Sequence, residues 1–148
     1  MAEITIPGYT VVRKIGSGSF GDIYIVRRSS DGIEHAAKVI DLSGASATEE
    51  EDIQNEVKML QRLHHQGVLK FISSIHDARE LKLIIVTELC PGGDLEKHVS
   101  RLPGKRLATV VVLGVCCRVL QALRYLHLEG IIHRDLKVHD IRKGSIVR

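Results

Sequence analysis

The sequence is poor in cysteine and has no long run of charge of one sign. Its 148 residues include 3 cysteines, Cys90, Cys116 and Cys117. These form neither a Cys-x-x-Cys pair nor an even disulfide framework, so we expect reduced thiols in a cytosolic protein. The formal net charge is only +3, and the lysines and arginines are dispersed among carboxylates. This pattern favours neither a nucleic-acid-binding surface nor a membrane-binding surface.

Targeting and membrane signals are also scarce. The first residues, Met-Ala-Glu-Ile-Thr, lack the basic and apolar segments of a secretory signal. The longest apolar stretch, Leu107 to Val119, is interrupted by Gly114 and Arg118. It is shorter than the about 20 residues that a membrane-spanning helix needs. The histidines and cysteines lack zinc-ligand spacing. At 44% hydrophobic and 26% charged residues, the chain is predicted to be a soluble cytoplasmic domain without membrane insertion.

The first part of the chain is predicted to form strands. Alternating, β-branched segments at residues 9–15, 22–27 and 33–40 are typical of strands, and the Asp31-Gly32 pair indicates a hairpin turn. Further strands are expected at residues 69–75 and 81–87.

Helices are predicted between and after these strands. After a loop at residues 43–47, we interpret Thr48 and Glu51 as a capping box that opens a helix to about Leu63. Pro91-Gly92-Gly93 breaks the chain, and the pattern then becomes helical from Asp94 to about Arg101 and from Leu107 to Leu128.

A glycine-rich segment, Gly16-x-Gly18-x-x-Gly21, lies between the first strands. The same spacing marks dinucleotide-binding loops, but such a loop opens a helix. Here the third glycine leads into a β-branched segment, which favours a hairpin. Glycines let backbone N–H groups approach phosphate oxygens without obstruction by a side chain. An ordinary glycine-rich hairpin remains the alternative.

Lys38 is a single cation in a small, apolar strand. Alternation along that strand puts Ala36, Lys38 and Ile40 on one face. A lysine among apolar residues is costly to bury without an anion, and Glu56 in the predicted helix is a plausible partner. Together they could hold the α- and β-phosphates of ATP. The alternative is a surface lysine whose stem covers apolar residues.

The glycine motif, Lys38, Glu56 and the run His133-Arg134-Asp135-Leu136-Lys137 together resemble the eukaryotic protein-kinase signature set. The resemblance extends from about Tyr9 to about Ile141. Lys137 resembles the serine/threonine class, and the glycine loop and residues 88–95 are most similar to the NIMA-related (Nek) kinases.

This resemblance implies an α+β kinase-like fold. It implies an N-lobe at residues 9–87, with a five-stranded antiparallel sheet and helix C, a hinge at 88–93, and an incomplete helical C-lobe at 94–148.

The resemblance also implies roles for individual residues, with ATP and Mg²⁺ as cofactors and a protein as substrate or binding partner. Asp135 would orient or accept the proton of the substrate hydroxyl, and Lys137 would neutralise the transferred phosphoryl group. The residues expected to bind nucleotide are Ile15, Gly16, Gly18, Gly21, Ile23, Ala36, Lys38, Glu56, Thr87, Glu88, Cys90 and Asp94.

The sequence also departs from the kinase pattern. Asp140 stands where kinases have a metal-binding asparagine; it can offer oxygen to Mg²⁺ but lacks an amide donor. No Asp-Phe-Gly follows, since the 2 phenylalanines are Phe20 and Phe71. We therefore expect this chain alone to be inactive, and a non-catalytic pseudokinase or interaction module is the alternative. We also expect an exposed apolar patch along residues 107–128, leading to aggregation or a partner protein.

Overall fold

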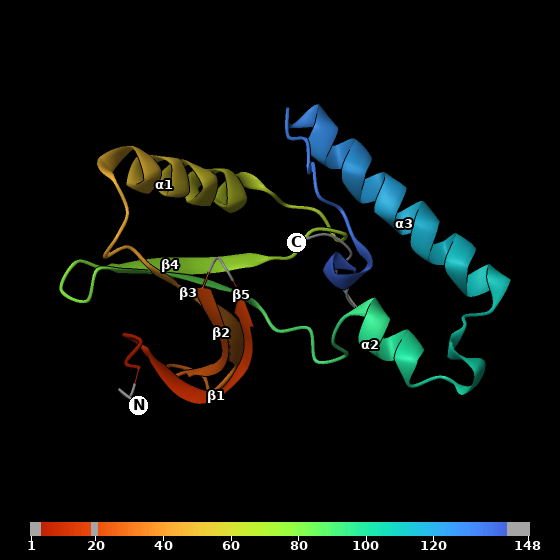
Figure 1. The fold of residues 1–148 in the computed structure, drawn as a ribbon, viewed down its shortest axis with the longest axis horizontal. Helices are drawn as coiled ribbons and strands as arrows, with labels where there is room; N and C mark the ends of the chain where they lie inside the picture. Colours follow the sequence, from red (N-terminus) through yellow and green to blue (C-terminus); the bar gives the residue numbers. More distant parts are fainter. Residues whose placement is uncertain (1–3, 19–20, 142–148) are drawn as a thin grey trace. The chain divides into compact units, whose positions relative to one another are not determined.

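The computed structural model describes residues 4–18 and 21–141. The chain forms two compact units. One consists of residues 1–63 and 71–89, and the other of residues 64–70 and 90–148. In Figure 1 the colours run from red at the N-terminus to blue at the C-terminus, so the sheet lies in the red-to-green part of the chain and the helices of the second unit in the green-to-blue part. The predicted strands and helices are all present, with boundaries that differ by only a few residues.

The first unit is a five-stranded antiparallel sheet with one helix. The strand order is β1-β2-β3-β5-β4. The strands are β1 (Tyr9–Gly18), β2 (Gly21–Arg28), β3 (Glu34–Asp41), β4 (Phe71–Asp77) and β5 (Lys82–Glu88). Helix α1 (Ala47–Arg62) connects β3 to the segment that leads into β4.

The turn between β2 and β3 forms where the Asp-Gly pair predicted it. Gly32 has φ +72°, a left-handed conformation that glycine adopts at no steric cost. The Asp31 carboxylate accepts a hydrogen bond from the Ile33 N–H over 3.0 Å. The Arg28 side chain also donates two hydrogen bonds to that carboxylate. These bonds fix the hairpin, and with it the pairing of β2 with β3.

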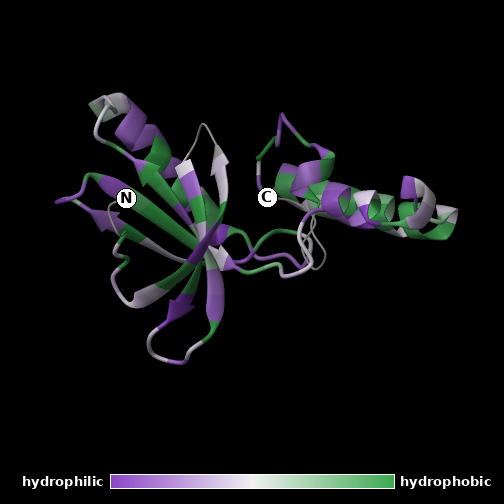
Figure 2. Cartoon of the chain, turned by 60° about the horizontal axis from the view of Figure 1, so that its bottom comes forward, coloured by the Kyte–Doolittle hydropathy of each residue, from purple (hydrophilic) through white to green (hydrophobic). Residues whose placement is uncertain are grey.

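Each face of the sheet packs against a hydrophobic cluster. One cluster combines buried strand residues with Ile6 from the N-terminal segment; its members are Ile6, Val26, Ala37, Val39, Ile84 and Val86. The other joins the opposite face to α1 through Val57, together with Leu42, Leu83 and Ile85. In Figure 2 the strands carry both green hydrophobic stretches and purple hydrophilic stretches. Strand alternation explains the division, because neighbouring residues along a strand point to opposite faces.

The start of α1 differs from the prediction. The N-cap is Ser46, whose side chain accepts from the Glu49 N–H, while the Glu49 carboxylate accepts from the Ser46 N–H. The interpretation of Thr48 and Glu51 as the capping pair was wrong. Both pairs have the capping-box spacing, but Ser46 has the extended backbone of an N-cap (φ −73°, ψ 161°), whereas Thr48 already lies within the helix.

The second unit contains helices α2 (Leu95–Ser100) and α3 (Thr109–Leu128), with the short 3₁₀ turns η1 (Pro103–Lys105) and η2 (Val138–Asp140). Asp94 caps α2 by accepting from the Lys97 N–H over 2.8 Å. The predicted helices at 94–101 and 107–128 are therefore confirmed, each beginning within about two residues of the prediction.

Helix α3 holds residues 64–70, the connection between α1 and β4. The Tyr125 hydroxyl accepts a hydrogen bond from the His64 N–H over 2.8 Å, and its ring stacks on His65. A Cβ added at Gly67 would lie 3.0 Å from the Cβ of Ala122, so the connection and the helix are in close contact. Ala122 and Leu126 are the buried residues of α3.

The remainder of α3 carries the predicted apolar surface. Val110 is 76% exposed, Leu113 59% and Leu120 64%. Green hydrophobic segments run along this helix in Figure 2. Over 18 residues its mean hydropathy is 1.6, and its 20 residues could cross a membrane by length and composition alone. The apolar segment is therefore longer than the count ending at Val119 suggested, although a core helix of a soluble protein meets the same criterion.

Candidate functional site

The glycine hairpin between β1 and β2 lies tightly against β3. Gly18 pairs with Gly21, and Gly16 pairs with Ile23; residues 19 and 20 lie outside the described part. Gly21 has φ +116°, and a Cβ there would come 2.1 Å from the Val39 carbonyl oxygen. A Cβ at Gly16 would meet only Ile23, at an ordinary 3.7 Å. Packing therefore requires glycine at position 21, whereas it does not at position 16.

A polar network beside this hairpin was missed by the sequence reasoning. The Asp22 carboxylate pairs with Lys14 over 2.7 Å and accepts hydrogen bonds from Ser17 over 2.6 Å and from Tyr24 over 3.3 Å. The hydrogen bond with Lys14 lowers the pKa of Asp22 and raises that of Lys14. Since Lys14 and Ser17 belong to β1 and Asp22 to β2, the network ties the strands together next to the glycines.

The register of the sheet brings predicted nucleotide-binding residues onto one face. Ile23 of β2 pairs with Lys38 of β3, and Ala36 of β3 pairs with Thr87 of β5. Directly paired residues in antiparallel strands point to the same face, and alternation puts Ala36 and Lys38 on that face together. Lys38 is half-buried there. Ile15, near the glycines, is 36% exposed.

Two predicted acidic residues of the first unit lie outside this strand face. Glu56 is exposed on α1. This helix packs against the face of the sheet that carries Ile85, and Ile85 is the register partner of Lys38. The pairing of Glu56 with Lys38 stays a prediction. Glu88 ends β5 and is the register partner of His35.

In the second unit, the segment around Asp135 forms a charged pair. The Lys137 ammonium contacts the Asp135 carboxylate over 2.8 Å. This hydrogen bond lowers the pKa of Asp135 and raises the pKa of Lys137. Both side chains are exposed, with Asp135 at 79%. Arg134 between His133 and Asp135 has φ +63°, a conformation that turns the chain sharply before the carboxylate.

Asp140 serves a structural purpose in the described chain. One of its carboxylate oxygens accepts a hydrogen bond from the Lys137 N–H over 2.9 Å, which closes η2. This turn packs against α2: His139 contacts Glu96, and the Leu95 N–H donates to the Ile141 carbonyl over 2.8 Å. An asparagine oxygen at position 140 could accept the same bond. Aspartate in place of asparagine would therefore keep the turn and add a negative charge to it.

Asp94 and Cys90 are the remaining residues that were predicted to bind nucleotide. Asp94 is only 5% exposed, and its carboxylate also pairs with the Lys97 ammonium over 3.2 Å. Burial opposes ionisation, but the hydrogen bonds from Lys97 outweigh it and lower the pKa of Asp94. Cys90 is half-buried. Within residues 4–18 and 21–141, no group of three or more His, Cys, Asp or Glu side chains could hold a metal.

Comparison with known proteins identifies the fold. A sequence model of the protein kinase domain matches residues 9–141. The chain belongs to the protein kinase family. It is 32% identical over 133 residues to human serine/threonine-protein kinase Nek5, and 33% identical over 133 residues to Danio rerio serine/threonine-protein kinase 10. Each alignment covers 90% of this chain. Aurora/IPL1-related protein kinase 2 of Caenorhabditis elegans is 28% identical over 144 residues, 97% of this chain.

The first two of these relatives are serine/threonine-protein kinases, and the resemblance to the Nek kinases is confirmed. The α+β architecture is also confirmed: the five-stranded sheet with α1 is the kinase N-lobe arrangement, followed by a partial helical lobe. This chain spans 18% of the length of Nek5, 13% of serine/threonine-protein kinase 10 and 46% of the Caenorhabditis elegans kinase.

Proposed function

We propose that this chain supplies the nucleotide-binding lobe and the catalytic loop of a serine/threonine protein kinase. The observation that carries the proposal is the sheet register, which puts Ile23, Ala36, Lys38 and Thr87 on one face. On this proposal, residues 9–87 are the N-lobe, 88–93 the hinge and 94–141 the described part of the C-lobe. ATP is the nucleotide, and the acceptor is a serine or threonine hydroxyl of a protein.

On this proposal, different predicted residues contact different parts of the nucleotide. Ile15, Ile23 and Ala36 are suited to the flat, apolar adenine ring, with Thr87 beside them. The backbone groups of Glu88 and Cys90 would bond the adenine edge, and Asp94 the ribose. Lys38, with Glu56, would hold the phosphates, while backbone N–H groups of the glycine hairpin approach them from above.

Asp135 and Lys137 are suited to the transfer itself. The acceptor oxygen forms a bond to the γ-phosphorus as the bond to the β–γ bridging oxygen breaks, and ADP leaves. Asp135, whose exposed carboxyl group is ionised at neutral pH as in any ordinary aspartate, would orient the hydroxyl and take its proton. Lys137 would offset charge on the transferring group. Asp140 fits a hard cation through a carboxylate oxygen, and bound Mg²⁺ would neutralise phosphate charge.

Nucleotide binding is tested first, with purified chain in a thermal unfolding assay with and without Mg·ATP. A nucleotide at about 100 times its Kd stabilises the fold by about 2.7 kcal/mol. We expect a rise in Tm that Lys38→Ala abolishes and that Lys58→Ala, on the exposed side of α1, retains. An unchanged Tm for the parent chain at millimolar Mg·ATP would contradict the proposal.

A second candidate is a non-catalytic nucleotide-binding or interaction module. It is favoured by Asp140, whose carboxylate caps η2 and adds negative charge near Asp135. Transfer of labelled phosphate to a generic protein substrate separates the candidates. Transfer that Asp135→Asn eliminates supports the kinase activity of this chain. Nucleotide-dependent stabilisation with no transfer above that of Asp135→Asn supports the non-catalytic module.

The cellular setting is part of the same proposal. We place the protein in the cytoplasm, with ATP and a protein substrate or binding partner as its ligands. The apolar residues of α3 would then contact protein rather than lipid, and no nucleic-acid partner is proposed. Fractionation of cells that express the tagged chain tests this: recovery in the membrane pellet after alkaline extraction would contradict it.

A further inference from the structure

His35 is a buried histidine without a hydrogen-bond partner in the described part of the chain. Its side chain lies in β3, directly before Ala36, and is only 5% exposed. Both ring nitrogens are inaccessible to solvent, and neither makes a hydrogen bond among the described residues. A buried polar group without a partner costs free energy. A charged imidazolium in the same place costs more, because it loses its hydration as well.

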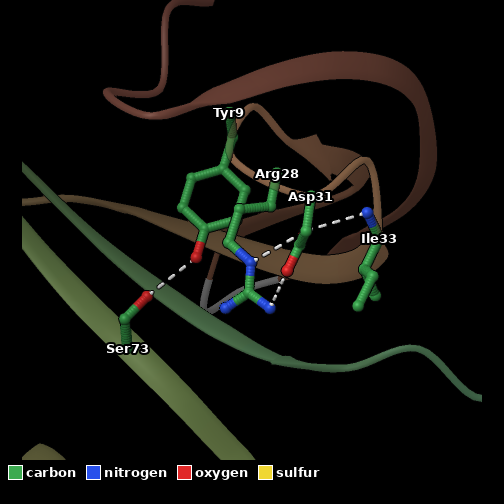
Figure 3. A network of polar contacts seen from close by, with 5 residues as sticks. All are labelled: Tyr9, Arg28, Asp31, Ile33 and Ser73. Carbon is green, nitrogen blue, oxygen red and sulfur yellow. Dashed lines mark hydrogen bonds and ion pairs between the residues drawn. The ribbon is translucent and has the colours of Figure 1, made fainter.

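The surroundings of His35 compensate only in part for a positive charge. Tyr9 of β1 meets the ring edge-on, with centroids 6.1 Å apart, and its hydroxyl bonds to Ser73 of β4 over 3.2 Å. Figure 3 shows this Tyr9–Ser73 bond beside the pairing of Arg28 with Asp31. The Asp31 carboxylate favours protonation of His35, but it is already engaged by two hydrogen bonds from Arg28.

The charged groups near His35 act in opposite directions. The Arg28 guanidinium, from β2, disfavours the imidazolium, while Asp31 in the turn and a backbone group of Thr87 in β5 favour it. Glu88 is the register partner of His35 on β5. Burial is the dominant influence, and with Arg28 it lowers the pKa of His35 below its ordinary 6.5.

We propose that His35 is an acid-sensitive switch in the sheet. Its protonation loosens the pairing of β2 with β3 near the Asp31-Gly32 turn, and with it β3, the strand that carries Ala36 and Lys38. Well above pH 6.5 the imidazole is neutral in both the folded and the unfolded chain, and it contributes no pH dependence. Below that value the unfolded chain binds a proton that the folded chain excludes, so the fold loses stability as the pH falls. The switch rests on the fold; its effect on ATP rests also on the proposed function.

Stability measured against pH tests the switch in the full chain. Urea unfolding is followed between pH 7.5 and 5 for the parent chain, His35→Leu and His35→Phe. A control, His76→Gln, changes an exposed histidine of β4. One differentially bound proton raises the unfolding equilibrium constant by up to about tenfold per pH unit. We expect the parent and His76→Gln to show this added loss below pH 6.5, and the His35 variants to lack it.

A direct titration keeps the test decisive if the His35 variants fail to fold. The imidazole signals of His35 in the parent chain are followed by NMR, and deuterium exchange of the β3 amides is compared at pH 7.5 and 5.5. A His35 pKa of 6.5 or above overturns the proposal, as do equal pH slopes for the parent and a folded His35→Leu variant. Loss of the Mg·ATP-dependent Tm shift at pH 5.5 extends the switch to the nucleotide; absence of that shift at every pH counts against the proposed function instead.

Discussion

Gly21 shows how strictly one position can be restricted by its neighbours. Its φ of +116° and the Val39 carbonyl, 2.1 Å from a hypothetical Cβ, together exclude any side chain unless β3 shifts. We predict that Gly21→Ala destabilises the chain by about 2 kcal/mol or more, since backbone strain and overpacking add. The midpoint of urea unfolding measures this. Gly44→Ala is the control, because a Cβ at Gly44 would meet nothing within 4 Å.

The Asp135–Lys137 pair gives a prediction about the ionisation of a single carboxyl group. Lys137 is the chief cause of the lowered pKa of Asp135, through a hydrogen bond and then through its charge. Lys137→Met removes both effects, so the Asp135 pKa should rise toward its ordinary value. The carboxylate would then become protonated at a higher pH than in the parent. Carbon-detected NMR titration of the Asp135 carboxyl measures the change; an unaltered titration in Lys137→Met would show that the pair does not persist in solution.

Among the elements, α1 offers a direct test of its own starting point. The Ser46 side chain accepts from the Glu49 N–H, so Ser46→Ala leaves a helix N–H without its partner. The expected cost is about 1 kcal/mol. Thr48→Ala should change stability by only a few tenths of that, because Thr48 lies inside the helix. Thermal unfolding of the two variants compares them, and a larger loss for Thr48→Ala would reassign the cap.

Helix α3 depends on one close contact with residues 64–70. Ala122 is fully buried, and its Cβ lies opposite Gly67, leaving no room for a larger group. We predict that Ala122→Leu costs about 1–3 kcal/mol through overpacking. Cys117, another small residue of α3, is exposed, so Cys117→Leu should be nearly neutral. Denaturant unfolding followed by circular dichroism measures both; equal losses would argue against the docked position of α3.

The elements themselves could largely be predicted from the sequence, because periodicity and turn residues act locally. The strand containing Lys38 is an example: alternation alone put Ala36 and Lys38 on one face. The start of α1 could not be predicted from the sequence, since the acidic residues give the capping-box spacing to Ser46 and to Thr48 alike. The Asp22–Lys14 pair was missed for another reason. The β1–β2 register shifts between Val11 and Arg13 and between Lys14 and Gly16, and such bulges have no reliable local signal.

At the scale of the whole molecule, the exposed apolar residues of α3 lead to a prediction about self-association in solution. Val110, Leu113 and Leu120 are 76%, 59% and 64% exposed, and they recur at helical spacing on one side. We predict that the isolated chain self-associates, since exposed apolar patches of this kind favour association. The combined variant Val110→Lys, Leu113→Gln and Leu120→Gln should shift the chain toward monomer without lowering its Tm. Light scattering after size-exclusion chromatography measures this, and a monodisperse parent chain would contradict it.

The docking of residues 64–70 on α3 has a consequence for synthesis. The ribosome completes β5 at Glu88 well before it reaches Tyr125, whose hydroxyl receives the His64 N–H. At about 5–20 residues per second, the residues between Glu88 and Tyr125 take on the order of seconds to synthesise. The α1–β4 connection lacks its contact with Tyr125 for that interval, and slow codons there would lengthen it.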